Sequence, residues 1–225
     1  MISKIMQVFE FLVEKYDPTP VYYDITSFPI VSDLVKNKKI FYKELNGISG
    51  IKFKDISADT TPDKYFKDSN WTVFFLIAYG NPIESNILKC PETYSILSKH
   101  KNIKTAMFSI LPPGSFMEYH RGPYKGVLRC LFKLKLEDKT GDVGLDVMGV
   151  TRQWKNTECI IFDDTLQHKA WNLSNGNRVV LFLDLIRPLP FPLSCINSFF
   201  LYLMRKNKRI KNIYNFYKKQ NNFKD

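Results

Sequence analysis

The clearest alternation of apolar and polar positions in the chain runs through VLRCLFKLKL, residues 127–136. Every second residue from Leu128 to Leu136 is apolar, whereas Arg129, Lys133 and Lys135 lie at alternating positions between them. A period of two residues is that of a β-strand, whose successive side chains point to opposite faces of a sheet. This stretch is therefore predicted to be a strand with one apolar and one largely basic face.

Residues 104–187 are divided into short apolar runs separated by turn-forming residues. The predicted strands are KTAMFSIL (104–111), SFMEYH (115–120), VLRCLFKLKL (127–136), VGLDVMG (143–149), ECIIFD (158–163), HKAWNL (168–173) and RVVLFLDLI (178–186). SNGN at 174–177 predicts a hairpin between the last two strands, and Arg187-Pro188 ends the final one. About eight short strands at this spacing are typical of a sandwich or jelly-roll barrel.

The first hundred residues favour helices and one buried strand. In residues 1–16 the apolar side chains fall at helical spacing, which predicts an amphipathic packing helix rather than a secretory signal. A second helix is predicted for residues 32–47, with Ser32 as its N-cap and a glycine as its stop. WTVFFLIAY (71–79) is predicted to be a buried strand, and residues 91–99 a short helix that begins at its proline.

Composition favours one globular domain. Of the 225 residues, 44% are hydrophobic and 15% aromatic, which excludes a disordered chain, and this length suits one sizeable core rather than two. We predict a single domain over residues 1–190, with its barrel at about 104–187, and a basic helical extension over 191–225. The net charge is +11, but residues 205–225 hold eight Lys and Arg and one Asp, so the rest of the chain carries only +4.

Cysteine usage and hydropathy bear on the compartment. The cysteines, which form no C-x-x-C pair, are Cys90, Cys130, Cys159 and Cys195. We interpret them as buried free thiols, which suit a reducing compartment. No apolar run reaches the roughly 18 residues of a membrane-spanning helix. The expected location is therefore the cytoplasm, with peripheral attachment to a membrane left open.

Two of the three histidines stand at the ends of predicted strands. His120 closes a strand just before Gly122, and His168 opens one just after the Asp163-Asp164 turn, whereas His100 has no such place. Two imidazoles at strand ends of a small barrel could converge on one metal ion. Taken alone, a histidine at a strand end is more often a surface or hydrogen-bonded residue.

Two arginines strengthen the hypothesis of a binding site inside the barrel. Arg178 begins the strand after His168, and Arg129 lies in the strand after His120. An arginine that points into a barrel needs an anionic partner, because an unpaired buried guanidinium is costly. A dicarboxylate could satisfy both arginines, one through each carboxylate. The alternative for Arg178 is an ordinary ion pair with Asp184 or Asp163, and both interpretations stay open on these residues alone.

Two longer motifs resemble the aspartyl/asparaginyl β-hydroxylase family. They are FSILPPGSFMEYHRGPYKGVLR (108–129) and WKNTECIIFDDTLQHKAWNLSNGNRVVLFLDLIRP (154–188). The first places His-x-Gly-Pro nine residues before Arg129, and the second places Asp-Asp-x-x-x-His ten residues before Arg178. FPIVSDLVKNKKIFYKEL (28–45) also resembles the helix that leads into the family's barrel. The resemblance covers roughly residues 20–190 and is specific, because both motifs occur in order.

The resemblance implies a mainly β fold, a double-stranded β-helix of jelly-roll or cupin-like form with flanking N-terminal and C-terminal helices. It implies Fe(II) as the cofactor, 2-oxoglutarate as a cosubstrate and O₂ as the oxidant. His120 and His168 match the family's iron ligands. Gly122 stands where most such dioxygenases place an acidic ligand, and in this family a water is thought to fill that position.

The resemblance also assigns the residues around the cosubstrate. Arg178 matches the arginine that pairs with the distal carboxylate of 2-oxoglutarate, Ser109 matches a hydroxyl near that carboxylate, and Arg129 matches the arginine near the other one. Leu131 departs from the family, because the vertebrate peptidyl members have a cosubstrate-contacting histidine there. Asp164 is expected to orient the metal site from behind, with a plain turn cap as its alternative role.

The implied activity is hydroxylation of an unactivated C–H bond. The first expected substrate is the β-carbon of a peptidyl Asp or Asn. The alternative is a lipid acyl chain at a membrane surface, since lipid A acyl-chain hydroxylases of the same superfamily also carry helical sequence after the barrel. A catalytically silent binding barrel is the alternative of another class. The presence of His120, His168, Arg129 and Arg178 together argues against it.

The end of the chain offers three interpretations. An apolar block around residues 199–204 precedes the basic run, which predicts a C-terminal helix packed on the body with a solvated basic end. The first alternative is an interfacial helix that contacts an anionic membrane. The second is nucleic-acid binding through basic residues interleaved with Tyr214, Phe216 and Tyr217, and we do not expect a nucleic-acid partner.

Overall fold

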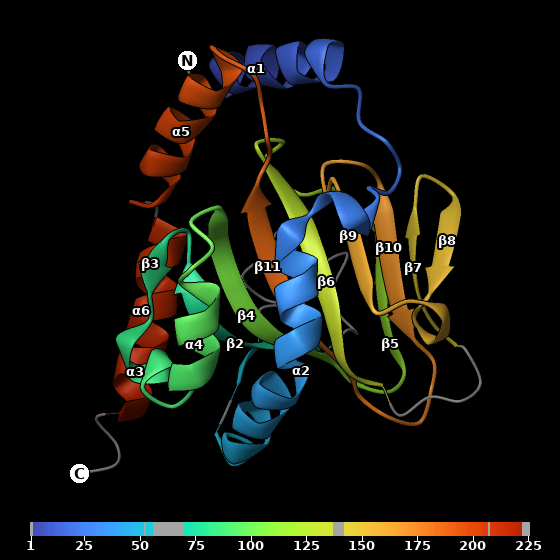
Figure 1. Cartoon of the computed structure of the whole chain (residues 1–225), viewed down its shortest axis with the longest axis vertical. Coiled ribbons are helices and arrows are strands. Elements are labelled where there is room, and N and C mark those ends of the chain that lie inside the picture. The colour runs from blue at the N-terminus through green and yellow to red at the C-terminus, as the bar shows by residue number, and fades with distance from the viewer. Residues whose placement is uncertain (1, 52, 56–69, 137–141, 207, 222–225) are drawn as a thin grey trace.

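The computed structural model describes the chain except for residues 1, 52, 56–69, 137–141, 207 and 222–225. Two antiparallel sheets form the body of the protein (Figure 1). The larger sheet has the order β1-β2-β4-β11-β6-β9, with β3 paired to β2. Its strands are β1 (Lys54–Asp55), β2 (Thr72–Ala78), β3 (Asn81–Pro82), β4 (Ile103–Leu111), β6 (Val127–Leu136), β9 (Cys159–Phe162) and β11 (Arg178–Ile186). The smaller sheet has the order β5-β10-β7-β8, with strands β5 (Ser115–His120), β7 (Val143–Val147), β8 (Val150–Gln153) and β10 (His168–Asn172).

The path of the chain from β4 to β11 defines the fold. Successive strands change sheet at every step except from β7 to β8, because β4, β6, β9 and β11 lie in the larger sheet and β5, β7, β8 and β10 in the smaller one. Eight strands that wind between two antiparallel sheets in this way form a double-stranded β-helix, or jelly roll. The predicted fold class is therefore confirmed, including its flanking helices.

The hairpin predicted at residues 174–177 is wrong. β10 pairs with β5 and β7, whereas β11 pairs with β4 and β6, so this turn carries the chain from one sheet to the other. Asn172 holds the crossing, because its side-chain amide donates to the carbonyls of Leu111 at 2.7 Å and Gly176 at 2.8 Å. The real two-residue hairpin joins β7 to β8, where Met148 and Gly149 both have positive φ. β8 was not predicted from the sequence.

The two faces of β6 meet different surroundings, as its alternation predicts. Helix α2 (Pro29–Gly47) packs beside β6, and Lys38 of α2 lies 5.8 Å from the ring of Phe132 on the apolar face (Figure 1). On the other face, Arg129 forms an ion pair with Asp164, which precedes β10 of the smaller sheet. The part of β6 that carries Arg129 therefore faces the space between the two sheets. Lys133 and Lys135, further along the strand, instead line the groove beside α2.

The N-terminal helices agree with the prediction except at one end. α1 covers Ile2–Tyr16, and α4 (Pro91–Leu97) begins at its proline as expected, after the short α3 (Glu84–Ile87). α2 ends at Gly47 but begins at Pro29, three residues before the predicted cap. Ser32 donates its hydroxyl to the Pro29 carbonyl inside the first turn and is therefore not the cap. The proline itself starts the helix, since its fixed φ suits the first helical position.

The C-terminal segment forms two helices, α5 (Leu193–Met204) and α6 (Lys208–Asn221), and both pack on the rest of the protein. α6 lies along the edge of the larger sheet, where the hydroxyl of the buried Tyr217 donates to the Val73 carbonyl at 2.8 Å (Figure 1). Tyr217 is therefore unable to stack on a nucleobase, which removes one of the three aromatic residues on which the nucleic-acid alternative rested. In the described part of the chain, no helix combines the length and the hydrophobicity that crossing a bilayer requires.

The cysteines are free thiols. Cys90, Cys130 and Cys159 are buried, as predicted, whereas Cys195 on α5 is exposed. The sulfur atoms of Cys130 and Cys159 lie 3.6 Å apart across β6 and β9.

Candidate active site

The two strand-end histidines face each other across the smaller sheet. His120 is the last residue of β5 and His168 the first of β10, and they are direct partners in the antiparallel register. Their ring centroids lie 4.1 Å apart, with the ring planes at 54°. The strand pairing therefore brings together two imidazoles that are 48 residues apart in the sequence. The third histidine, His100, binds elsewhere, with its Nε2 3.1 Å from Asp33 of α2.

Backbone carbonyls fix the orientation of both rings. Nδ1 of His120 lies 2.7 Å from the Glu118 carbonyl, and Nδ1 of His168 lies 2.9 Å from the Leu166 carbonyl. A carbonyl can only accept, so a neutral ring keeps its hydrogen on Nδ1 and its lone pair on Nε2. Burial lowers the pKa of His120, and burial followed by the neighbouring His120 lowers the pKa of His168 to about 3. Both rings are therefore held in the neutral form that binds metal ions.

The carboxylate of Asp164 occupies the space that the side chain of a metal ligand at position 122 would need. A Cβ added at Gly122 would overlap the carboxylate of Asp164, and the Gly122 amide donates to the Asp164 carbonyl at 2.6 Å. Across the described residues, no group of three or more His, Cys, Asp or Glu side chains is arranged to hold a metal ion. His120 and His168 could therefore offer two imidazoles to a metal ion, while the carboxylate beside Gly122, that of Asp164, is paired with Arg129. Their role as iron ligands stays a prediction.

The carboxylate of Asp164 belongs to a buried ion-pair network. Its Oδ2 lies 2.7 Å from a terminal nitrogen of Arg129, and the same guanidinium group lies 3.1 Å from Asp184. Burial raises the pKa of Asp164 to about 6, against the opposing attraction of Arg129. The cap of the turn is instead Asp163, whose carboxylate accepts from the Thr165 amide at 2.9 Å. The role of turn cap that we weighed for Asp164 therefore belongs to its neighbour.

Arg178 is a buried cation without a carboxylate partner in the described part of the chain. Only 4% of the residue is exposed, and its Nε has no hydrogen-bond partner among the described residues. The two acids considered as partners are engaged elsewhere, because Asp184 pairs with Arg129 and Asp163 pairs with Arg187 and Lys125. Burial lowers the pKa of Arg178 to about 10. Since burying an unpaired charge costs several kcal/mol, this guanidinium is suited to a bound anion.

Arg178 and the histidine pair face the same interior. Arg178 shares one face of β11 with Phe182 and Asp184, because alternate residues of a strand point the same way. The Phe182 ring lies 4.2 Å from the Arg129 guanidinium, which pairs with Asp164 beside Gly122. The site thus lies between the two sheets.

Ser109 lies on β4 of the larger sheet, beside the same face of β11. It is opposite Val180, two residues along the strand from Arg178. Its hydroxyl is fully buried and accepts from the indole of Trp71 at 2.8 Å, which leaves the hydroxyl hydrogen able to donate. The expected contact of Ser109 with a cosubstrate stays a prediction, as does that of Arg129, which already pairs with two aspartates.

A buried charge network behind the histidines was not predicted from the sequence. Arg187 is fully buried and forms ion pairs with Asp163 and, at 3.0 Å, with Asp17, while Lys125 lies 3.0 Å from Asp163. These ion pairs connect the loop before His168 to the end of β11 and to the segment that follows α1. The arginine that follows the last apolar strand was the only available signal, and it was interpreted as a strand end.

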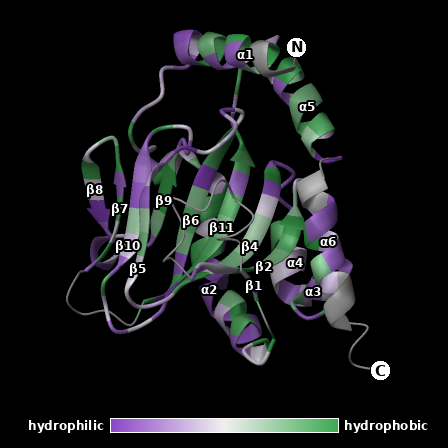
Figure 2. Cartoon of the chain, turned by 180° about the vertical axis from the view of Figure 1, so that it is seen from behind, coloured by the Kyte–Doolittle hydropathy of each residue, from purple (hydrophilic) through white to green (hydrophobic). Residues whose placement is uncertain are grey.

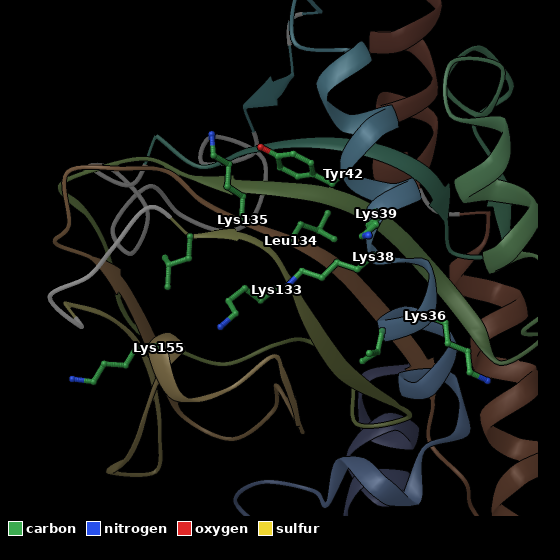
Figure 3. Close-up of a pocket in the computed structure, with 10 residues that line it drawn as sticks. Lys36, Lys38, Lys39, Tyr42, Lys133, Leu134, Lys135 and Lys155 are labelled. Atoms are coloured by element: carbon green, nitrogen blue, oxygen red, sulfur yellow. The ribbon is translucent and has the colours of Figure 1, made fainter.

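A basic groove lies apart from this site, between α2 and β6, and has a volume of about 890 Å³ (Figure 3). Its basic residues are Lys36, Lys38, Lys39, Lys133, Lys135 and Lys155. Glu158 pairs with two of them, Lys38 at 2.5 Å and Lys133 at 3.0 Å. Neither histidine nor Arg178 lines the groove, so it is not part of the candidate active site.

The interior of the jelly roll thus holds two neighbouring neutral imidazoles and a buried arginine that has no carboxylate partner among the described residues. The sequence model of the family described as aspartyl/asparaginyl beta-hydroxylase matches residues 36–188. Because this match spans more than half of the sequence, the chain belongs to that family. The resemblance inferred from the two motifs is confirmed.

Curated relatives carry two kinds of name. The chain is 36% identical over 183 residues to the ornithine lipid ester-linked acyl 2-hydroxylase of Rhizobium tropici, an alignment of 79% of this chain and 64% of that protein. It is 33% identical over 130 residues to aspartate beta-hydroxylase domain-containing protein 2 of Xenopus tropicalis, covering 52% and 34%. It is 26% identical over 124 residues to human aspartyl/asparaginyl beta-hydroxylase, covering 53% and 16%. The chain thus spans less than two thirds of the length of each.

Solved structures with a related arrangement include a prolyl-4-hydroxylase from Pseudomonas putida. It has a TM-score of 0.43 at 12% identity and covers 69% of this chain and 87% of its own. A viral collagen prolyl hydroxylase from Paramecium Bursaria Chlorella virus-1 has a TM-score of 0.37 at 15% identity, covering 64% and 91%. Both scores are low, and the fold assignment rests on the strand order instead.

Proposed function

We propose that this chain is an Fe(II)- and 2-oxoglutarate-dependent hydroxylase. The observation that carries the proposal is Arg178, a buried guanidinium without a carboxylate partner in the described part of the chain, in the interior that also holds two neutral imidazoles. A catalytically silent barrel gains nothing from a buried guanidinium that no described carboxylate neutralises, because burying such a charge destabilises the fold. The family membership supports the same function.

His120 and His168 would hold the metal through their Nε2 atoms. The carbonyls of Glu118 and Leu166 fix the hydrogens on Nδ1 and so aim both lone pairs before an ion arrives. Imidazole suits Fe(II), and two protein ligands leave room for cosubstrate and O₂. When bound, Fe(II) and 2-oxoglutarate supply the oxidising power for hydroxylation of a C–H bond with O₂.

Arg178 would pair with the distal carboxylate of 2-oxoglutarate, and the Ser109 hydroxyl would donate to the same group. We propose that Arg129 binds the other carboxylate while its guanidinium also remains paired with Asp164 and Asp184. The Phe182 ring packs beneath Arg129 and lies 6.2 Å from the Trp71 ring, so these aromatic side chains help to exclude water from the site. In a dry site, charge-assisted pairs are strong and hold the ligand in one orientation.

The substrate proposed first is the β-carbon of a peptidyl Asp or Asn. The alignment lengths favour a lipid acyl chain as a second candidate. The relative named for an ornithine lipid aligns over 183 residues, whereas the human aspartyl/asparaginyl beta-hydroxylase aligns over 124. By the resemblance, the vertebrate peptidyl members have a histidine where this chain has the buried Leu131. This difference also favours the lipid candidate.

The test is formation of succinate from 2-oxoglutarate by purified protein supplied with Fe(II). We expect succinate with the wild type, none with His120→Ala or His168→Ala, and an unchanged rate with His100→Ala, because His100 pairs with Asp33 instead. Mass spectrometry of peptide and lipid mixtures then identifies the product that gains one oxygen atom. Full activity in either histidine variant would refute the metal site.

A further inference from the structure

Exposed apolar side chains are concentrated on two helices at one end of the molecule. Of the fourteen large hydrophobic side chains that are exposed in the described part of the chain, eight belong to α1, to α5 or to the segment just before α5. They form what we term the α1–α5 surface: Ile5, Val8, Phe11, Tyr16, Phe191, Phe199, Tyr202 and Leu203. Isolated exposed apolar residues are ordinary, whereas a concentration of them marks an interaction surface.

The inward faces of both helices are already filled by other residues. Phe9 and Val13 of α1 pack with Phe200 and Leu201 of α5 in a small apolar cluster, and each is less than 6% exposed. A helix that only packed on the body would be polar on its other side. Both helices instead present large apolar side chains there as well, and Figure 2 shows the hydrophobic colour along much of α5.

Cations accompany the exposed apolar side chains. Lys15 follows Phe11 by four residues and therefore lies on the same flank of α1. Lys206 follows Tyr202 by four residues, and its Nζ lies 4.8 Å from that ring. Lys15 and Lys206 are exposed and have no carboxylate partner among the residues that the structure describes.

The acids next to these cations are directed toward the barrel instead. Glu14 lies 2.7 Å from Nζ of the buried Lys125, and Asp17 lies 3.0 Å from the buried Arg187. Negative charge is thus neutralised on the inner side, while apolar and positive groups remain on the outer side. Apolar residues with basic neighbours suit an anionic lipid surface, where rings enter the headgroup layer and cations meet phosphate.

The α1–α5 surface is tied to the end of the barrel that carries the histidines. Tyr124, four residues after His120, stacks on Phe9 of α1 with the ring centroids 5.9 Å apart. Its hydroxyl donates to the side chain of Asn197 on α5 at 2.6 Å, and Asn197 donates in turn to the Gly126 carbonyl at 2.8 Å. The loop that follows the first proposed metal ligand is therefore bound to both helices.

We propose that the α1–α5 surface docks on an anionic lipid bilayer and holds the histidine end of the barrel at the membrane. The docking needs no metal and no turnover. Docking of this kind would favour the second candidate substrate, a lipid acyl chain, over a peptidyl Asp or Asn, and this consequence rests on the proposed hydroxylase function. A face that attaches to lipid beside the site gives an acyl chain a short path to it.

Vesicle flotation without iron or 2-oxoglutarate tests the docking separately from catalysis. We expect the protein to float with vesicles of phosphatidylglycerol and phosphatidylcholine, and to bind phosphatidylcholine vesicles more weakly. Phe11→Ser combined with Phe199→Ser should lower the partition coefficient by about tenfold or more, since binding scales with buried apolar area. Lys15→Glu combined with Lys206→Glu should remove the preference for the anionic vesicles.

The matched control is Leu88→Ser combined with Leu173→Ser, which removes two equally exposed apolar side chains away from these helices. This variant should float like the wild type. The proposal would be overturned if the Phe11→Ser, Phe199→Ser variant bound vesicles as well as the wild type does. It would also be overturned if the wild type bound anionic and phosphatidylcholine vesicles equally. A wild-type dimer in light scattering that Phe11→Ser and Phe199→Ser dissociate would overturn it too, because the surface would then join two copies of the chain.

Discussion

At the scale of single residues, Gly122 and Asp164 share one space. The carboxylate of Asp164 is almost fully buried beside Gly122, 2.7 Å from Arg129, where a side chain at position 122 would begin. The two residues are 42 positions apart, so no local pattern in the sequence relates them. The glycine of the His-x-Gly-Pro motif is thus required by packing, which the motif alone did not reveal.

Gly122→Ala should destabilise the protein, because the new methyl group displaces the Asp164 carboxylate from Arg129. Overpacking of a buried site costs roughly 1–3 kcal/mol. Urea unfolding should show this loss for Gly122→Ala and a change within about 0.5 kcal/mol for Gly50→Ala, where an added Cβ meets no atom within 4 Å. In an Asp164→Ala background the same Gly122→Ala change should cost less. Equal costs in both backgrounds would show that the two residues do not compete.

Arg178→Ala should weaken binding of 2-oxoglutarate much more than binding of Fe(II). Truncating one partner of a desolvated charge pair costs roughly 2–5 kcal/mol, which is roughly 30- to several thousand-fold in affinity. Arg178→Lys should restore part of the binding, since an ammonium lacks the planar fork. Calorimetry of both ligands measures the effect, with Arg152→Ala as the control on β8.

The ligand-free protein offers a second measurement on Arg178. In the described part of the chain its removal leaves no acid without a partner, so Arg178→Ala should not lower the free energy of unfolding by the several kcal/mol that breaking a buried pair costs. Unchanged 2-oxoglutarate binding in Arg178→Ala would return the arginine to a structural role.

Asp164 should make the stability of the metal-free protein depend on pH. The fold raises its pKa from 3.8 to about 6, chiefly by burial, so the folded state binds the proton more tightly than the unfolded state. Its stabilising contribution is therefore full below pH 3.8 and is lost as the pH rises through about 6. Relative to Asp164→Asn, the wild type should lose roughly 1–3 kcal/mol across this window. If the urea midpoints of the wild type and of Asp164→Asn changed equally with pH, the raised pKa of Asp164 would be contradicted.

At the scale of elements, local patterns located the strands but not their partners. β5, β6 and β11 have the boundaries that their alternation and flanking turns predict. The Ser174–Asn177 turn looked like a hairpin, because turn residues report a reversal of the chain and not the sheet that the next strand joins. β8 was missed because VTRQ is short and has only one apolar residue, although the Met148-Gly149 pair before it carried a usable turn signal.

The same distinction applies to the candidate site. The motifs gave His120, His168 and Arg178 in advance, because each sits at a strand end that the pattern fixes. That Arg178 has no carboxylate partner among the described residues was not predictable, since it depends on Asp184 and Asp163 pairing with other cations across the fold. Pairing of this kind is a property of three-dimensional packing, which spacing along one strand does not determine.

Tyr217 should be the main polar anchor of α6. Its buried hydroxyl donates to the Val73 carbonyl at 2.8 Å and accepts from the Phe75 amide at 3.2 Å. Tyr217→Phe leaves both backbone groups of β2 without this partner, so unfolding experiments should show a loss of about 1–3 kcal/mol. Tyr202→Phe is the control, because that side chain is exposed. Equal effects of the two changes would mean that the Tyr217 hydroxyl does not anchor α6.

At the scale of the whole molecule, distant segments meet in one buried charge network. Arg187 joins Asp17, just after α1, to Asp163, just before the second histidine strand. The helix pair that carries the α1–α5 surface is therefore linked through fixed charges to the loop that positions His168. A substitution in the segment after α1 is therefore expected to alter the position of the loop before His168, and the reverse.

Arg187→Met should be strongly destabilising for this reason. It leaves the buried Asp163 with Lys125 as its cationic partner, and breaking a buried pair costs about 3–5 kcal/mol. Thermal or urea unfolding measures the loss, and Fe(II) affinity should fall as the loop before His168 loosens. Arg205→Met, at an exposed arginine, should change stability by no more than about 0.5 kcal/mol. A neutral Arg187→Met would show that the network does not support the fold.

The position of β11 has a consequence for how the protein is made. This strand lies between β4 and β6 in the larger sheet, yet it leaves the ribosome after every other described strand of that sheet. Until residues 178–186 are added, β4 and β6 each present an unpaired edge, and open edges of apolar strands recruit other chains. Nascent chains halted before residue 178 are therefore the stage at which aggregation threatens, and a chaperone that covers the edges of β4 and β6 would protect synthesis best.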